Sequence, residues 1–188
     1  MTAETTVSTV GSDLRALRKS RGLTLIDVAD TLDCSVGWLS QVERGQSTAS
    51  LPILKQLAAL YDVPVSLFFG PAPARAGEEG FVVRASDRRV IGTETDGLTE
   101  ALLSPDLTDA FELLHCRFAP HSQSLEAVKR ATQEVAVLIS GALTLEIGDY
   151  IFELDPGDSF RIRGEPYRWF NPHPTPAIAI WAIAPPVY

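Results

Sequence analysis

Residues 12–69, SDLRALRKSRGLTLIDVADTLDCSVGWLSQVERGQSTASLPILKQLAALYDVPVSLFF, decide the fold of this chain. Apolar residues recur in them at helical spacing, and polar breaks interrupt the pattern every eight to twelve positions. Spacing of this kind places apolar side chains along one face of each helix. The stretch therefore predicts a compact bundle of about five short helices.

Capping residues set the expected ends of the first two helices. The first should start at Ser12 or Asp13 and stop before Gly22, because glycine readily adopts the left-handed conformation that ends helices. Thr24 and Asp27 have the spacing of a capping box, in which each side chain binds the backbone N–H of the other residue. A second helix should begin there.

The next helices follow from the same signals. Ser35 is a suitable N-cap for a third helix that Gly45 closes, and Ser50 is one for a fourth, with Pro52 tolerated in its first turn. Residues 65–69 predict a short fifth helix. The side chains expected to face inward from the third and fourth helices are Val36, Leu39, Val42, Leu54, Leu57, Ala58 and Tyr61.

The segment resembles the DNA-binding domain of the Xre/phage-repressor family through Ala29, residues 37–41 (GWLSQ) and residues 43–45 (ERG). The resemblance implies a helix-turn-helix whose third helix enters the major groove of DNA. The residues expected to contact DNA are Thr24, Ser35, Gly37, Trp38, Gln41, Arg44, Gln46 and Ser47.

Different roles are expected within this set. The Gln41 amide can form a bidentate contact with adenine, whereas Arg44, Gln46 and Ser47 are placed to bind phosphate. Two positions have a structural alternative: Gln41 as a solvated helix residue, and Trp38 as a shield over the bundle. Glu43 is expected to pair with a basic residue inside the motif.

The formal net charge of the 188-residue chain is −8, which is unusual for a DNA-binding protein. Residues 1–70 account for −1 and residues 71–188 for −7. Non-specific attraction to phosphate should therefore be weak. Affinity would have to come from specific contacts, helix N-termini and two copies bound at once, which favours a homodimer on an inverted-repeat operator.

Composition also suggests the domain boundaries. Residues 1–11 are polar and are expected to be disordered, residues 12–70 form the DNA-binding domain, and residues 71–80 are a Pro- and Gly-rich linker to a domain at residues 81–188. No segment predicts a membrane span or a signal peptide. Cys34 and Cys116 fall in different domains, so buried free thiols and a cytoplasmic location are expected.

Beyond the linker, the apolar period changes from about four to two, which is typical of an all-β barrel or jelly roll. Strands are expected at residues 81–83, 111–118, 134–139, 143–147, 150–154 and 177–184, with a hairpin turn at Gly148–Asp149. Glu134 with Gly141, and residues 155–158 (DPGD) with Gly164 and Asn171, resemble the two halves of a cupin. The whole chain is thus expected to be α+β in two domains.

The cupin resemblance implies four metal ligands, but only Glu134 of the four is retained. The other three positions carry Val128, Arg130 and Tyr167, which are poor or impossible ligands. His115, His121 and His173 match none of these positions. No cofactor and no catalytic residues are therefore expected, and the chain is not expected to be an enzyme.

We expect a transcription regulator whose barrel dimerises the protein and senses a small metabolite. Arg130, Glu134 and Tyr167 are expected to share the interior face, with Arg130 and Glu134 on one strand, and to receive an anionic or carbonyl group. Alternatives are an Arg130–Glu134 ion pair, a metal-independent isomerase or lyase that uses Glu134 and Tyr167, and a barrel that only dimerises. The operator, the effector, and the choice between repressor and activator are not encoded in any motif.

Overall fold

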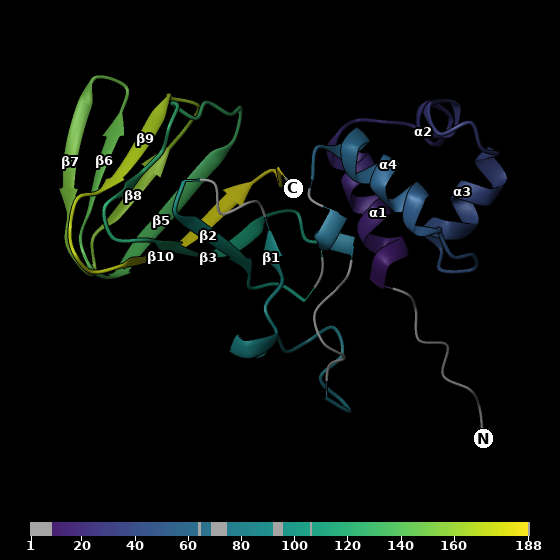
Figure 1. Cartoon of the computed structure of the whole chain (residues 1–188), viewed down its shortest axis with the longest axis horizontal. Helices are drawn as coiled ribbons and strands as arrows, with labels where there is room; N and C mark the ends of the chain where they lie inside the picture. Colours follow the sequence, from purple (N-terminus) through teal and green to yellow (C-terminus); the bar gives the residue numbers. More distant parts are fainter. Residues whose placement is uncertain (1–8, 64, 69–74, 92–95, 106, 188) are drawn as a thin grey trace. The chain divides into compact units, whose positions relative to one another are not determined.

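The computed structural model describes residues 9–63, 65–68, 75–91, 96–105 and 107–187. The chain divides into two compact units, one helical and one rich in β-strands (Figure 1). The helical unit lies within residues 1–82, and the short segment 105–109 groups with it. The β unit comprises most of residues 83–187.

The helical unit contains four α-helices and one 3-10 helix among its described residues: α1 (Thr9–Ser20), α2 (Leu25–Thr31), α3 (Val36–Glu43), α4 (Leu51–Tyr61) and η1 (Val65–Phe68). The expected fifth helix is therefore a 3-10 turn, and its last expected residue, Phe69, lies outside the described residues. The apolar faces meet in a core that includes Leu14, Leu17, Val28, Leu39, Leu57, Tyr61, Leu67 and Phe68.

The predicted start of the first helix was wrong. Helix α1 begins at Thr9, so residues 9–11, expected to be disordered, are helical; residues 1–8 lie outside the described residues. The cause is tertiary packing, because Gly11 is buried and a Cβ there would collide with the carbonyl oxygen of Val42. Close approach of α1 to the end of α3 thus extends the helix.

Two expectations at helix starts also need correction. Val36 was expected in the core, but it is 40% exposed at the first position of α3. Ser50 holds the N-cap position of α4 without donating or accepting a side-chain capping bond. The other predicted inward residues of α3 and α4 are buried.

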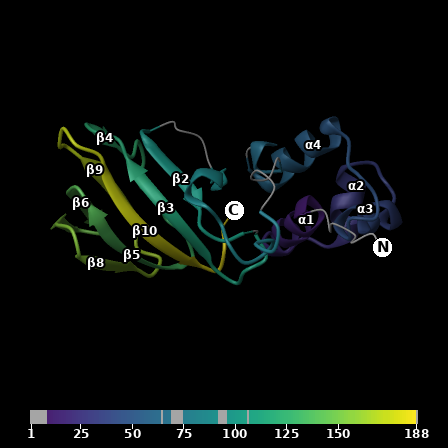
Figure 2. The same ribbon diagram turned by 90° about the horizontal axis from the view of Figure 1, so that it is seen from below.

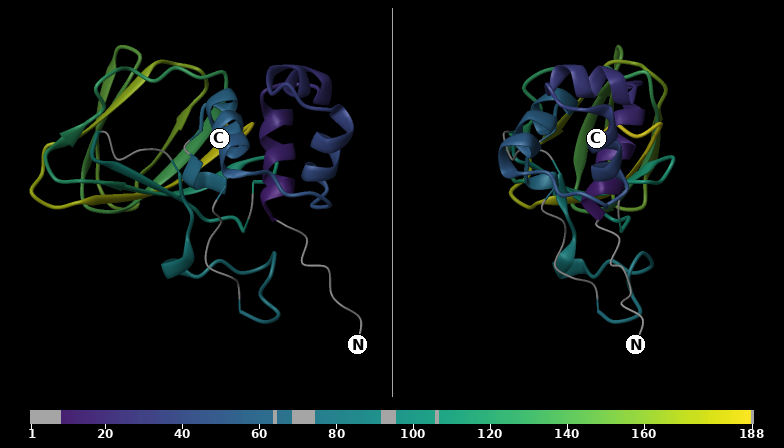
Figure 3. Two further views of the ribbon diagram at one scale, coloured as in Figure 1. Left: turned by 45° about the vertical axis from the view of Figure 1, so that its right-hand side comes forward. Right: turned by 90° about the vertical axis from the view of Figure 1, so that its right-hand side faces the viewer.

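The β unit forms two antiparallel sheets. Its strands are β1 (Val90–Ile91), β2 (Leu98–Leu102), β3 (Glu112–Phe118), β4 (Ser122–Gln123), β5 (Gln133–Ser140), β6 (Leu143–Ile147), β7 (Tyr150–Leu154), β8 (Ser159–Ile162), β9 (Tyr167–Asn171) and β10 (Ala177–Ala184). One sheet has the order β1-β2-β3-β10-β5-β8 and the other β4-β9-β6-β7. Figure 2 shows β10 between β3 and β5, and Figure 3 shows the two sheets facing each other.

The interior of this sandwich is packed mainly with apolar side chains. Alternate residues of β3, β5 and β10 are buried, and the two sheets contribute Phe118 and Trp169, whose rings meet edge to face at 4.9 Å. Asn171 is fully buried and donates to the carbonyl oxygens of Phe118, Ala119 and Thr175, which ties β9 to the neighbouring loops. The two layers are thus held by aromatic packing and by one buried amide.

Six strands were predicted from the sequence, and the structure confirms only some of them. Residues 143–147, 150–154 and 177–184 are strands as predicted, and Gly148 forms the expected hairpin turn with φ of +57°. Residues 81–83 are not a strand, since Phe81 lies in a turn and is 85% exposed. Of the expected linker, residues 71–74 lie outside the described residues, and 75–80 include two turns.

Candidate functional site

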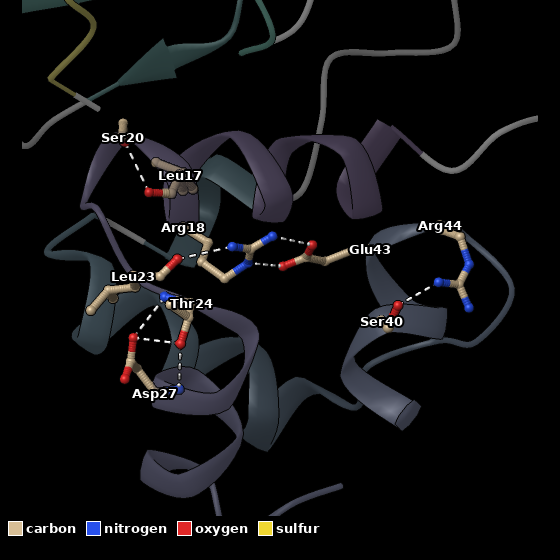
Figure 4. Close-up of polar contacts among 9 residues, drawn as sticks. All are labelled: Leu17, Arg18, Ser20, Leu23, Thr24, Asp27, Ser40, Glu43 and Arg44. Carbon is tan, nitrogen blue, oxygen red and sulfur yellow. Dashed lines mark hydrogen bonds and ion pairs between the residues drawn. The ribbon is translucent and has the colours of Figure 1, made fainter. Parts of the chain in front are cut away.

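The α2–α3 segment is built by local capping. The Thr24 hydroxyl accepts a bond from the Asp27 N–H, and the Asp27 carboxylate accepts one from the Thr24 N–H at 2.7 Å, which is the predicted capping box (Figure 4). Asp33 then adopts φ of +50°, and the Ser35 hydroxyl caps α3 by accepting from the Trp38 N–H at 3.1 Å. These bonds fix where α3 begins.

Helix α3 has one buried and one exposed face. Leu39, Val42 and Glu43 are buried, whereas Ser35, Gly37 and Gln41 are exposed and Trp38 is half-buried. Gly37 and Gln41 are four residues apart and therefore neighbours on the helix surface. The exposed face thus includes Gln41, the residue predicted to read a base.

A network of short-range bonds organises the segment after α3. The Arg44 guanidinium donates to the Ser40 hydroxyl and, at 3.2 Å, to the side-chain oxygen of Gln46. The backbone N–H groups of Gln46 and Ser47 both donate to the Gln41 carbonyl oxygen. Arg44 and Gln46 are exposed, so this polar segment lies on the surface beside the end of α3.

Beneath that surface, Glu43 forms the expected internal ion pair, and its partner is Arg18 of α1 (Figure 4). The contact is bidentate, with distances of 2.6 Å from Nε to Oε1 and 2.9 Å from Nη2 to Oε2. A third bond runs from Arg18 to the Leu23 carbonyl oxygen at 2.9 Å. Burial, and next the nearby Glu43 charge, raise the pKa of Tyr61 well above its usual range.

The four cupin-motif positions lie close together in the β unit. Val128 and Tyr167 form an antiparallel bridge, with N–H to O distances of 2.8 and 2.9 Å in the two directions. The Tyr167 hydroxyl donates to Glu134 at 3.3 Å, which joins the two sheets across the interior. Burial, and next the Glu134 charge, raise the pKa of Tyr167. The nearby Arg130 guanidinium lowers that pKa in part.

The expected geometry of Arg130 was wrong. It lies in the loop before β5, which begins at Gln133, so it does not share a strand with Glu134. Within the described residues, Arg130 forms no hydrogen bond or ion pair, and Glu134 instead accepts bonds from Thr132 at 2.7 Å and Trp181 at 2.9 Å. Three donors thus satisfy Glu134, and two of them were not anticipated.

These residues do not fit the metal that cupin resemblance implies. Glu134 is the one carboxylate at the four positions, and both its oxygens already accept hydrogen bonds from side chains. The histidines lie elsewhere: His115 is on β3 between the buried residues Leu114 and Cys116, while His121 and His173 are in loops. Across the described ranges, no group of three His, Cys, Asp or Glu could hold a metal ion.

A further acid of the interior was missed because strand β2 was not predicted. Glu100 lies opposite Cys116 in the β2–β3 register, and Leu98 and Leu102 lie opposite the buried Phe118 and Leu114. Glu100 therefore points to the inner face of the sheet. Burial raises the pKa of its carboxyl, and Arg130 partly offsets this. Burial also raises the pKa of the Cys116 thiol, which is buried as expected, while Cys34 is half-buried.

A helical bundle with one capped helix presented outward beside a polar segment defines a helix-turn-helix DNA-binding protein. Residues 9–68 match the family model of the helix-turn-helix domain. The chain belongs to the helix-turn-helix family of transcriptional regulators, and its second unit is an antiparallel sandwich of two sheets. It is thus a DNA-binding transcriptional regulator.

Three known proteins are similar to this chain or to part of it. The chain is 32% identical to transcriptional regulator ClgR of Mycobacterium tuberculosis over 97 residues, which cover 51% of this chain and 87% of that protein. It is similar to a solved HTH_3-family transcriptional regulator from Vibrio cholerae (22% identity, 95% and 96% of the two chains, TM-score 0.44). It is also similar to an RmlC-like cupin from Shewanella frigidimarina (16% identity, 56% of this chain and 91% of that chain, TM-score 0.49).

None of the helices in the described ranges is long and apolar enough to cross a bilayer.

Proposed function

We propose that this regulator binds an inverted-repeat operator as a homodimer, with α3 of each copy in the major groove. The exposed face of α3 carries this proposal, because Gly37 and Gln41 are presented outward while Leu39, Val42 and Glu43 anchor the helix. Gln41 would read adenine through its amide. Ser35 and Trp38 would flank that contact.

Backbone phosphates would be bound by the segment around Arg44, Gln46 and Ser47. Arg44 is exposed and held by Ser40 and Gln46, so its guanidinium is already oriented before DNA arrives. Thr24, at the N-terminus of α2, would add a contact where that helix crosses the backbone. Phosphate contacts position the protein and carry no sequence information directly.

The low charge of the helical unit supports the proposed dimer. Residues 1–70 carry a formal charge of −1, so a single copy has little long-range attraction to DNA. Two linked copies raise the effective concentration of the second reading helix. Selection from a random DNA pool tests this proposal: symmetric half-sites about one helical turn apart, roughly 34 Å, or a multiple of it are expected. Asymmetric or unrelated sequences would refute the symmetric dimer.

The cupin barrel is proposed to bind a small metabolite and not to act as an enzyme. The supporting observation is Arg130, which has no ion pair within the described residues although it lies near Glu100 and Tyr167. A guanidinium can bind a carboxylate bidentately. Glu134 and Tyr167 would shape the site through their mutual hydrogen bond.

One contact favours a second candidate, a metal-independent acid–base enzyme. Tyr167 donates to Glu134, and burial raises the Tyr167 pKa, so the phenol stays protonated near neutral pH. However, Glu134 already accepts three hydrogen bonds, which leaves it poorly placed to remove a proton from a substrate. Turnover of a small polar metabolite without added metal, lost in Glu134→Gln, would favour the enzyme over the sensor.

A further inference from the structure

Two opposite charges of the barrel have no direct partner among the residues that the structure describes. Glu100 and Arg130 form no hydrogen bond or ion pair with any residue that the structure describes. Both are half-buried, and register places Glu100 on the inner face opposite Cys116. Arg130 lies between Val128, which is paired with Tyr167, and Thr132, which is bonded to Glu134.

Two other acids of the interior already accept hydrogen bonds. Glu134 accepts from Thr132, Tyr167 and Trp181, and Glu112 accepts from the backbone N–H of Val187. Because the Tyr167 hydroxyl donates its proton to Glu134, its remaining capacity toward a ligand is as an acceptor. For a ligand, this group of residues therefore provides one hydrogen-bond donor, the Arg130 guanidinium, and two acceptors, the Glu100 carboxylate and the Tyr167 hydroxyl oxygen.

We propose that the barrel binds a zwitterion, an amino acid whose carboxylate lies on Arg130 and whose ammonium lies between Glu100 and the Tyr167 hydroxyl oxygen. This inference rests on the proposed sensing function and narrows its ligand class. It also changes the expected ligand set, since Glu100 takes the place of Glu134 as the acid that contacts the ligand.

Electrostatics favours a zwitterion over a simple anion. Glu100, Glu112 and Glu134 all act on the buried Cys116 of this interior, and Arg130 is the cation that acts on the same thiol. An anion on Arg130 would meet this excess of carboxylates, and a like charge in a poorly solvated site is repelled strongly. An ammonium on the same ligand removes that repulsion and gives Glu100 a partner.

The test is thermal shift and calorimetry on the full chain. The probes are the proteinogenic amino acids with β-alanine and γ-aminobutyrate, and each hit is compared with its matched acid lacking the amine and its matched amine lacking the carboxylate. At least one amino acid should stabilise the protein by mass action, and both matched analogues should bind about tenfold or more weakly.

Variants locate the two contacts. Glu100→Gln and Arg130→Met should each weaken amino-acid binding by about tenfold or more, while the exposed neighbours Glu126→Gln and Lys129→Met serve as matched controls and should bind normally. Melting of the ligand-free variants shows whether each one folds. A variant that does not fold is replaced by Glu100→Ala or Arg130→Gln, for which the same loss is expected.

Three results would overturn the inference. If matched acids bind as well as the amino acid and Glu100→Gln binds normally, the ligand is an anion. The inference of a zwitterionic ligand is then wrong, but the proposed sensing function is retained. If matched amines bind as well and Arg130→Met binds normally, the ligand is a cation. If neither these probes nor a panel of carboxylates and carbonyl metabolites stabilises the protein, the zwitterion and the sensor fail together.

Discussion

Removing Glu43 should destabilise the helical unit while leaving its surface chemistry unchanged. In Glu43→Ala, the Arg18 side chain, only 11% exposed, loses both charge-assisted bonds and retains one bond to the Leu23 carbonyl oxygen. Leaving one partner of a buried pair uncompensated costs about 3–5 kcal/mol. Because Arg18 keeps one bond and is partly exposed, the expected loss of unfolding free energy is near the lower end of this range, at about 3 kcal/mol.

The measurement is chemical and thermal unfolding followed by far-ultraviolet circular dichroism, since all α-helices of the described residues belong to the helical unit. For a unit of this size the melting temperature should fall by at least about 12 °C. Asp30→Ala, an exposed acid on α2, is the control and should change stability by less than about 0.5 kcal/mol. Equal effects of the two variants would refute the assigned importance of the pair.

A double variant separates the charge from the packing. Arg18→Met with Glu43→Leu removes both charges and keeps apolar volume, so it should be more stable than Glu43→Ala. Replacing a buried pair with apolar residues is often neutral or stabilising, because neither charge remains to be desolvated. A double variant as unstable as the single one would show that the geometry of the pair, and not the orphaned charge, dominates.

Other expected outcomes concern the DNA-reading surface and the barrel. Gln41→Ala should relax base preference at one position in each half-site by about 1–3 kcal/mol, seen in binding to single-base operator variants. Arg44→Ala should weaken binding to all sequences alike and reduce the slope of log affinity against log salt by about 1. Gly37→Ala should stabilise the free protein by about 0.5–1 kcal/mol in chemical denaturation, because glycine weakens helices and an added Cβ meets nothing within 4 Å. A loss of stability would show that the fold requires glycine at this position. Elemental analysis should find no stoichiometric transition metal. One dialysis-resistant ion per chain would contradict the interpretation that Val128, Arg130 and Tyr167 have replaced the metal ligands.

Local chemistry explains why much of the helical unit could be predicted. The Thr24–Asp27 box and the Ser35 cap each involve residues three positions apart, so their spacing in the sequence already contains the contact. The start of α1 could not be found in this way, because it depends on Gly11 packing against a carbonyl of α3. The exposure of Val36 likewise depends on tertiary packing at the start of α3, which its spacing from Leu39 does not reveal.

The barrel interior was harder to predict, because its residues meet only through strand pairing. Glu134 and Tyr167 were named from motif resemblance, and they do contact each other across the two sheets. Glu100 could not be placed without the β2–β3 register, which puts it opposite Cys116. Arg130 was assumed to lie on a strand but lies in the loop before β5, so the alternation of strand faces that placed it beside Glu134 did not apply.

The division of α3 into an inner and an outer face has an evolutionary consequence. The Arg18 guanidinium joins α1, the Leu23 carbonyl before α2 and Glu43 at the end of α3, so one side chain holds three segments of the scaffold together. Gly37 and Gln41 take no part in that attachment and are exposed. Duplicated copies of such a gene can therefore exchange these outer residues and acquire new operators, while the bundle beneath them stays the same.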